Sequence, residues 1–243
     1  MENVLQVDNV YKNYKKIRAV NGISFDVEKG EIFALIGPNG AGKTTTLRMV
    51  ATLLKADGGE ITVGGFSVRQ DPLKVRQMIS YLPEEAGAYK NMTGEAYLQF
   101  MASVFYPDPG KKRKRVAYAK EVCDLGVRLK DRVGQYSKGM VRKLMIARAV
   151  MSEPVLAILD EPTSGLDVLN ALEIRNLIKS LAKDGATFLI SGHNMLEIEY
   201  VSDRVSIIHK GDIEETGTPA EIKKKYGAEN LEQAFSKVVA NVE

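Results

Sequence analysis

The stretch that most restricts the possible folds of this chain is GPNGAGKTT, residues 37–45, which matches the pattern G-x-x-x-x-G-K-[ST]. A short apolar run, IFALI, stands before it and predicts a buried strand, while apolar residues recur at helical spacing after it. The three glycines let successive backbone N–H groups turn inward, and a helix that begins near Lys43 directs the positive end of its dipole at the same point. The sequence therefore predicts a strand, a phosphate-binding loop and a helix in succession.

The residues of this loop have expected roles in binding a nucleotide. Lys43 should reach the β- and γ-phosphates, and the Thr44 hydroxyl should ligate Mg²⁺. A glycine-rich turn without a ligand is the alternative, but chance produces the pattern in only about one chain in a hundred of this length. A dinucleotide site would need the spacing G-x-G-x-x-G and no lysine after the last glycine. We therefore predict a nucleoside triphosphate site made of Gly37, Pro38, Asn39, Gly40, Ala41, Gly42, Lys43, Thr44 and Thr45.

A pair of acidic residues follows a second apolar run, in the stretch VLAILDEP. Asp160 and Glu161 stand where this strand ends, and open α/β sheets bind their ligands at the carboxyl ends of their strands. Asp160 suits the coordination sphere of Mg²⁺, and Glu161 is placed to orient or deprotonate an attacking water. A solvated acidic pair at a strand end is the alternative, and the phosphate-binding loop upstream favours the functional interpretation.

The remainder of the chain alternates between strand-like and helix-like patterns. The first thirty residues predict antiparallel strands, whereas VLAILD, TFLIS and RVSII have the pattern of fully buried parallel strands. Helical periods lie between them, which is typical of βαβ units. The middle of the chain, 85–152, has only helical spacing and predicts a helical insertion. The stretch NLEQAFSKVV predicts an amphipathic helix with Asn230 and Gln233 as its cap pair. Packing against the chain's own core is favoured over the alternative, binding to a partner.

Composition excludes some classes of protein. The chain has 243 residues, 44% of them hydrophobic, so it can bury a full core; its net charge of +3 is not the basic excess that favours nucleic-acid binding. The single cysteine, Cys123, cannot form an internal disulfide, and the first residues show no signal pattern. No apolar run approaches the roughly 20 residues that span a bilayer. We therefore expect a cytoplasmic location, a second chain for any membrane role, and a solvated helix start for the basic run KKRKR at 111–115.

The order of five motifs closely resembles that of one family. The phosphate-binding loop is followed by QYSKGM at 135–140, LAILDEP, SGLD at 164–167 and His193 in SGHNM. This succession is similar to the ATP-binding cassette of ABC transporters, and the resemblance extends from Val4 to about Pro219. It implies an α/β fold: a P-loop NTPase (RecA-like) mixed sheet with an N-terminal antiparallel β-subdomain and an inserted helical subdomain. The implied divisions are a cassette over 1–218, with core segments 1–84 and 153–218 and helical subdomain 85–152, and a C-terminal amphipathic helix over 219–243.

The resemblance also implies roles for individual residues. YSKGM is similar to the family's signature motif, which contacts the γ-phosphate held by the opposite subunit of a head-to-tail dimer; on its own it would predict only a serine cap. Tyr14 would stack on adenine, with Tyr11 as a lesser candidate. His193 would contact the γ-phosphate and, with Glu161, make up the catalytic pair, while Asp167 would couple the two ATP sites. The implied signature residues are Ser137, Lys138, Gly139 and Met140.

Two positions depart from the family's usual pattern. Glu84 stands where the family usually has a glutamine that ligates Mg²⁺, and Lys138 replaces the first signature glycine. A carboxylate can ligate Mg²⁺, but it adds negative charge near the γ-phosphate. Lys138 supplies a positive charge near the opposite phosphate, so we hypothesise that it offsets Glu84 across the dimer. The expected metal ligands are Thr44, Asp160 and Glu84.

The resemblance implies an ATP-binding and hydrolysing subunit of an ABC transporter, similar to bacterial exporter-type cassettes. It would bind ATP and Mg²⁺, dimerise with a second cassette, and drive transport through a separate transmembrane permease subunit, with export favoured over import. It would be peripheral on the inner face of the cell membrane and bind no nucleic acid. A soluble ABC-type ATPase in a non-transport process is the alternative, although the chain lacks the long heptad insertion or second cassette expected of one. A small-molecule P-loop kinase would leave YSKGM and SGLD unexplained.

Overall fold

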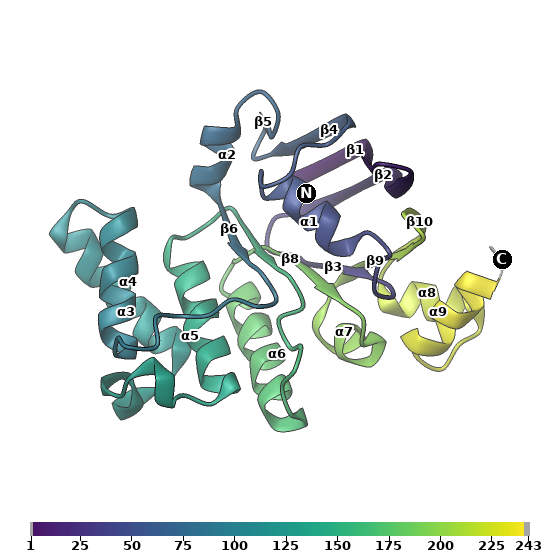
Figure 1. The fold of residues 1–243 in the computed structure, drawn as a ribbon. Coiled ribbons are helices and arrows are strands. Elements are labelled where there is room, and N and C mark those ends of the chain that lie inside the picture. Colours follow the sequence, from purple (N-terminus) through teal and green to yellow (C-terminus); the bar gives the residue numbers. More distant parts are fainter. Residues whose placement is uncertain (1, 241–243) are drawn as a thin grey trace.

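The computed structural model describes residues 2–240, and its larger sheet has six strands in the order β10-β9-β3-β8-β7-β6 (Figure 1). All neighbouring strands are parallel except β10, which pairs antiparallel with β9. The strands are β3 (Ile32–Ile36), β6 (Ile79–Leu82), β7 (Leu156–Leu159), β8 (Phe188–Gly192), β9 (Arg204–His209) and β10 (Asp212–Gly217). This sheet confirms the predicted α/β class and its mixed character, and it places the carboxyl ends of β3, β7 and β8 side by side.

The antiparallel strands expected over the first thirty residues are β1 and β2, and they lie in a second sheet of order β2-β1-β4-β5. Its strands are β1 (Asn3–Tyr14), β2 (Ile17–Glu28), β4 (Gly58–Val63) and β5 (Phe66–Ser67). Alternation along β2 buries Ile23, Phe25 and Val27 on one face. The Phe25 ring stacks on Phe33 of β3, with 5.2 Å between the ring centroids. The two sheets therefore share one apolar core.

Helices cover both faces of the larger sheet. Helix α1 (Lys43–Val50) lies between the two sheets and buries Leu47 and Val50 there (Figure 1). Helices α6 (Val168–Lys183) and α7 (Met195–Val201) cover the opposite face, where α6 packs Ile174 and Ile178 in one apolar cluster with the inward residues of β3. Helix α2 (Pro72–Met78) leads directly into β6. These layers therefore bury both faces of the strands whose carboxyl ends lie side by side.

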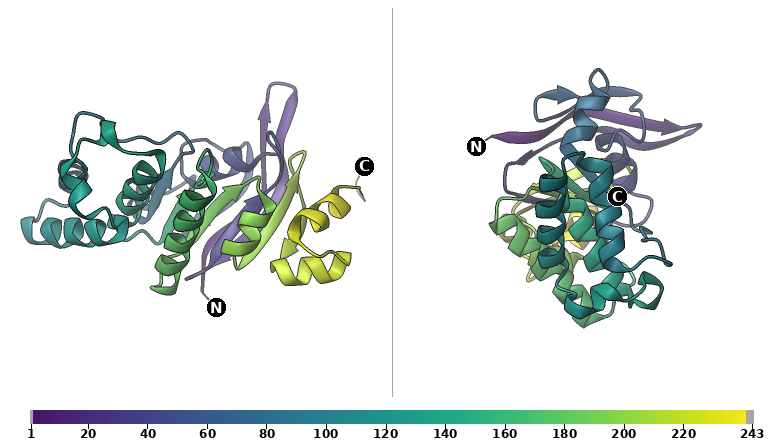
Figure 2. Two further views of the ribbon diagram at one scale, coloured as in Figure 1. Left: turned by 90° about the horizontal axis from the view of Figure 1, so that it is seen from below. Right: turned by 90° about the vertical axis from the view of Figure 1, so that its left-hand side faces the viewer.

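The segment 85–152, which is described throughout, folds as helices, as its spacing predicts. It contains α3 (Gly94–Phe105), α4 (Pro109–Cys123), the 3₁₀ turns η1 (Gly126–Lys130) and η2 (Val133–Gln135), and α5 (Lys138–Met151). The helices project together from one end of the larger sheet (Figure 2). The basic run occupies the first turns of α4, where the Asp108 side chain accepts a hydrogen bond from the Lys111 N–H at 2.7 Å. Most of that run is exposed, as expected of a solvated helix start.

The sequence patterns missed four of the strands in the described residues and joined two helices. The strands β4, β5, β6 and β10 were not predicted. The single helix expected over 219–243 is divided into α8 (Pro219–Tyr226) and α9 (Leu231–Ala240), because Gly227 adopts a left-handed conformation with φ of 55° and ends α8; residues 241–243 lie outside the described part. Helix α9 packs on the chain's own core, and the expected cap is present, with the Asn230 side chain accepting from the Gln233 N–H at 2.9 Å. Within residues 2–240, no helix combines the length and apolarity that crossing a bilayer demands.

Candidate functional site

The phosphate-binding loop joins β3 to α1, and two of its three glycines, Gly37 and Gly42, stand where a side chain would not fit. A Cβ on Gly37 would lie 2.1 Å from the Ile208 carbonyl oxygen, and one on Gly42 would lie 2.6 Å from that of Ala19. Gly42 also has φ of +111°, a conformation that side chains disfavour. The loop therefore forms a tight backbone cradle at the N-terminus of α1, which suits an anion.

Lys43 lies inside this cradle and is only 4% exposed. Its Nζ donates to the carbonyl oxygens of Gly37 at 2.8 Å and Pro38 at 3.2 Å. The same ammonium is 3.5 Å from Glu161 Oε1. A buried cation that rests on exchangeable carbonyl contacts is well placed to take phosphate oxygens instead, as predicted from the sequence.

The Asp160 carboxylate is 3% exposed and accepts hydrogen bonds from three hydroxyl groups. Oδ1 accepts from Thr44 Oγ1 at 3.1 Å and from Ser191 Oγ at 2.6 Å, while Oδ2 accepts from the Tyr81 hydroxyl at 3.3 Å. Burial raises the pKa of Tyr81, and the negative charge of Asp160 raises it further. The structure thus brings Thr44 and Asp160 together as predicted, and these hard oxygen donors fit Mg²⁺. Ser191 and Tyr81 are new members of the site, at the ends of β8 and β6.

Glu161 is 8% exposed and lies between the cradle and the predicted catalytic histidine. Its Oε2 is 2.6 Å from Nδ1 of His193, a side chain that is half exposed. Its backbone N–H donates to Ser191 Oγ at 2.9 Å, and its φ of 47° is unusual for a residue with a side chain. This backbone turns the carboxylate toward Lys43 and His193. The structure therefore brings the two catalytic candidates into contact.

Glu84 follows β6 and is exposed, and its hydrogen bonds within the described residues are not with the other expected metal ligands. Its Oε1 accepts from Ser164 Oγ at 2.7 Å, and its backbone carbonyl accepts from Arg142 Nη2 at 2.9 Å. Neither Ser164 nor Arg142 was singled out in the sequence. The role of Glu84 as a metal ligand stays a prediction.

The signature segment and the segment carrying Asp167 lie against each other within one chain. Ser137 caps α5 by accepting from the Met140 N–H at 3.2 Å, so it is a helix cap whatever else it binds. Gly139 is buried, and a Cβ there would lie 1.9 Å from Asn170 Oδ1. Asp167 caps α6 by accepting from the Asn170 N–H at 3.0 Å, and hydrogen bonds from Asn170 hold the pKa of Asp167 below its usual range. The two segments therefore form one surface.

The two tyrosine candidates have different surroundings. Tyr14, at the end of β1, is 45% exposed, and the Lys12 ammonium lies 5.9 Å from the centre of its ring. Tyr11 instead covers Gly58, where a Cβ would lie 2.2 Å from the tyrosine ring. The Tyr11 ring therefore packs on Gly58, whereas the exposed ring of Tyr14 agrees better with the predicted stacking on a base.

A phosphate cradle at the carboxyl end of a parallel strand, with an aspartate and a glutamate at the end of a nearby strand, defines a P-loop nucleoside triphosphatase. The chain belongs to the ABC transporter family, whose model matches residues 20–164. Within that family it is an ATP-binding, ATP-hydrolysing subunit, which excludes the kinase alternative.

Relatives with similar sequences are named for resistance and transport. The linearmycin resistance ATP-binding protein LnrL of Bacillus subtilis is 37% identical over 230 residues, covering 95% of this chain and 74% of that protein. The ABC transporter ATP-binding protein NatA of Bacillus subtilis is 36% identical, covering 94% of each chain. The bacitracin transport ATP-binding protein BcrA of Bacillus licheniformis is 36% identical, covering 97% and 76%. A solved ATP-binding subunit of an ABC transporter superposes with a TM-score of 0.85 at 29% identity, covering 97% and 99%.

Proposed function

We propose that this ATPase dimerises around two molecules of Mg-ATP and uses the closure and opening of the dimer to drive export through a separate transmembrane permease. The observation that carries the chemistry is the grouping of Lys43, Asp160, Glu161 and His193 around one phosphate cradle. Such a dimer converts ATP binding and hydrolysis into alternating high and low affinity between its halves.

Each residue of the cradle has a distinct chemical task. Lys43 exchanges its carbonyl contacts for phosphate oxygens, and the helix N-terminus adds backbone N–H donors. Thr44 and Asp160 would hold Mg²⁺, which neutralises phosphate charge when it is bound. Glu161 takes the proton from the attacking water, and His193 holds the Glu161 carboxylate by its contact at 2.6 Å. A general base of this kind contributes about 10²- to 10⁴-fold to the rate.

The dimer is supported by donors that this chain presents outward. Ser137 and Lys138 are exposed at the start of α5. The Ser137 oxygen accepts from the Met140 N–H, so its own hydroxyl proton is available to a phosphate oxygen. The family resemblance assigns this segment to the γ-phosphate of the opposite subunit, and Lys138 adds a positive charge there.

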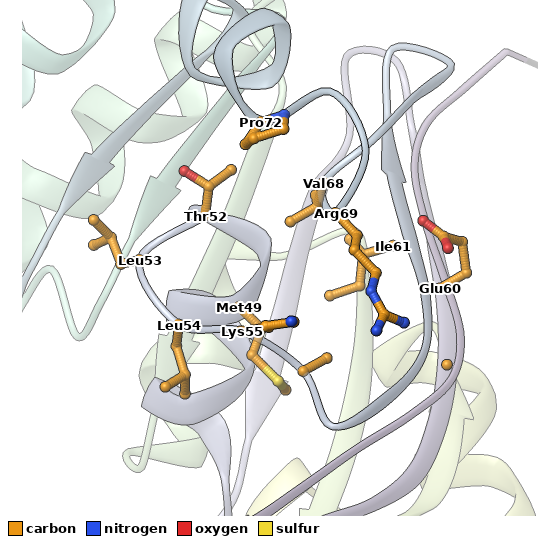
Figure 3. Close-up of a pocket in the computed structure, with 12 residues that line it drawn as sticks. Met49, Thr52, Leu53, Leu54, Lys55, Glu60, Ile61, Val68, Arg69 and Pro72 are labelled. Atoms are coloured by element: carbon orange, nitrogen blue, oxygen red, sulfur yellow. The ribbon is translucent and has the colours of Figure 1, made fainter.

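The proposed permease would dock beside Glu84 and the helical insertion. Tyr89 and Phe100 are exposed there and pack edge to face, with 5.8 Å between ring centroids. A pocket of about 590 Å³ lies beyond the end of α1 (Figure 3). Leu54 lines it on the α1 side and Ile61 on the β4 side. Exposed aromatic side chains such as Tyr89 and Phe100 favour a protein partner. Export and a position on the inner face of the membrane are supported by relatives named for resistance to linearmycin and for bacitracin transport.

The proposal is tested with the Glu161→Gln variant, which keeps the shape of the side chain and removes the base. In size-exclusion chromatography with ATP and Mg²⁺, we expect this variant to elute as a dimer and the wild type to return to monomer as ATP is consumed. A nucleotide-loaded variant that stays monomeric at every concentration would refute the sandwich. Co-purification with a membrane subunit would separate transport from the soluble alternative.

A further inference from the structure

Arg142 on α5 is a buried cation that the nucleotide site does not explain. The residue is 9% exposed. Its Nη2 donates to the Glu84 carbonyl, but its Nη1 is buried and makes no hydrogen bond within the described residues. Burial lowers the pKa of the guanidinium, and the negative charge of Glu84 raises it. A buried guanidinium with an unbonded nitrogen is unfavourable on its own. Its position therefore indicates a local requirement for the charge.

Glu84 connects Arg142 to the loop that leads to Asp167. Arg142 holds the Glu84 backbone from α5, and Ser164 holds the Glu84 carboxylate from the loop after β7. Helix α5 packs against both β6 and α6, so these contacts lie between elements that already touch. A glutamine at position 84, as is usual in the family, would bring no charge to this junction. The Glu84 carboxylate brings a negative charge to the junction. Near a triphosphate, a negative charge that no cation offsets weakens the binding of the nucleotide.

We propose that Arg142 is a positioning residue for Glu84: within a single subunit it fixes the backbone of Glu84 and offsets its charge, and Glu84 in turn ties α5 to the loop that carries Asp167. This proposal rests on the proposed function, because the charge of Glu84 affects nucleotide binding only if ATP binds close to it. It differs from the hypothesis that Lys138 offsets Glu84 across the dimer. Lys138 stands one helical turn before Arg142, is exposed, and directs its Nζ to within 3.9 Å of the position of a Cβ on Gly165.

The first test is a double-mutant cycle on ATP binding, without Mg²⁺ and at protein concentrations below dimer formation. Arg142→Gln should weaken ATP binding about threefold or more when Glu84 is present, and markedly less in the Glu84→Gln background. Arg142→Lys, which keeps the charge, should recover most of the affinity. Equal losses for Arg142→Gln and Arg142→Lys in both backgrounds would show a purely structural role and overturn the proposal.

Lys138→Gln is the matched control, because it removes a cation from the same helix one turn away. In the monomer its effect should be additive with Glu84→Gln. Coupling of Glu84 to Lys138 rather than to Arg142 under these conditions would assign the charge offset to Lys138 and contradict the proposal.

The second test needs no nucleotide. In urea unfolding of the full chain, the Arg142 and Glu84 substitutions should be non-additive, with the double variant less destabilised than the sum of the single variants. If Arg142→Gln does not fold, Ser164→Ala takes its place in the cycle with Glu84→Gln, because it removes the other contact of the junction. Additive unfolding free energies would overturn the tie. If the wild-type chain bound no ATP but the unfolding free energies were still non-additive, the proposed function would be refuted. The contact between Arg142 and Glu84 would still be supported.

Discussion

Replacing Ser191 with alanine should damage the site more than any other removal of a single hydroxyl near it. Ser191 is fully buried on β8, and its hydroxyl donates to Asp160 at 2.6 Å while accepting from the Glu161 N–H at 2.9 Å. It therefore holds both acidic residues at once. The left-handed backbone of Glu161, with φ of 47°, persists only when its surroundings support it. Alanine would leave the Asp160 carboxylate with one donor fewer and the Glu161 N–H without an acceptor.

The magnitude follows from these two bonds. A hydrogen bond to a charged group is worth about 1.5–3 kcal/mol and one between neutral groups about 1 kcal/mol. Asp160 keeps Thr44 and Tyr81 as donors, so the loss for Ser191→Ala should be about 2–3 kcal/mol. For a chain of this size, that corresponds to a fall in Tm of about 4–12 °C. ATP turnover should fall about 10- to 100-fold, because Glu161 loses its position over the cradle.

The assay compares Ser191→Ala with a matched control, Ser206→Ala. Ser206 on β9 is equally buried, but its hydroxyl bonds only to Thr216 Oγ1, at 2.6 Å, among the interactions described. The control should lose about 1 kcal/mol in urea unfolding and keep its turnover. Equal stability losses for the two variants, together with unchanged turnover for Ser191→Ala, would refute the role assigned to Ser191.

Three further predictions concern other residues of the site. Gly139→Ala should push Asn170 away, because the new Cβ would lie 1.9 Å from Asn170 Oδ1; ATP-driven dimerisation on size-exclusion chromatography should then be lost while ATP binding by the monomer persists, and normal dimerisation would contradict this. His193→Ala should lower ATP turnover about 10-fold or more by releasing Glu161, with little change in urea unfolding because the imidazole is half exposed; a matching loss of stability would point to a structural role. The lowered pKa of Asp167 makes its cap stabilising above the pKa of an unfolded aspartate, and this stabilisation is lost as the pH falls through the lowered value; Asp167→Asn should remove that part of the acid dependence in unfolding titrations, and an unchanged dependence would argue against the cap.

Much of the fold could be predicted from local pattern because the informative stretches are long or sharply bounded. Gly40 and Gly42 of the loop at 37–45 have φ of 82° and 111°, a backbone that favours glycine in any context, and the buried strands around the loop are continuous apolar runs. The acidic pair was predictable because it directly follows such a run. The contact between Glu161 and His193 then depends only on β7 and β8 being neighbours in the sheet.

What could not be predicted depends on which elements meet in space. β6 has four residues, mostly half-buried at the sheet edge, so it lacks the apolar run of a central strand. Ser191 acquires its role only because β8 lies beside β7, and nothing in TFLIS marks the serine. Arg142 has the appearance of an ordinary helical residue until α5 is packed against the end of β6. The contacts of Tyr14 with a base and of Ser137 with a second subunit stay predictions.

The contacts among the signature and Asp167 segments bear on how two ATP sites would communicate. Asn170 packs directly on Gly139 and also bonds Asp167, and Ser164, earlier in the same loop, bonds Glu84. In the proposed dimer, a second subunit that docks on the Ser137 surface would therefore contact one closely packed group rather than two separate loops. A displacement of Gly139 must move Asn170, because no free space separates two residues in close-packed contact. Asp167 and the Glu84 junction would move with it, so in the proposed dimer the binding of a nucleotide by the signature segment would displace Glu84, a predicted metal ligand of the same subunit.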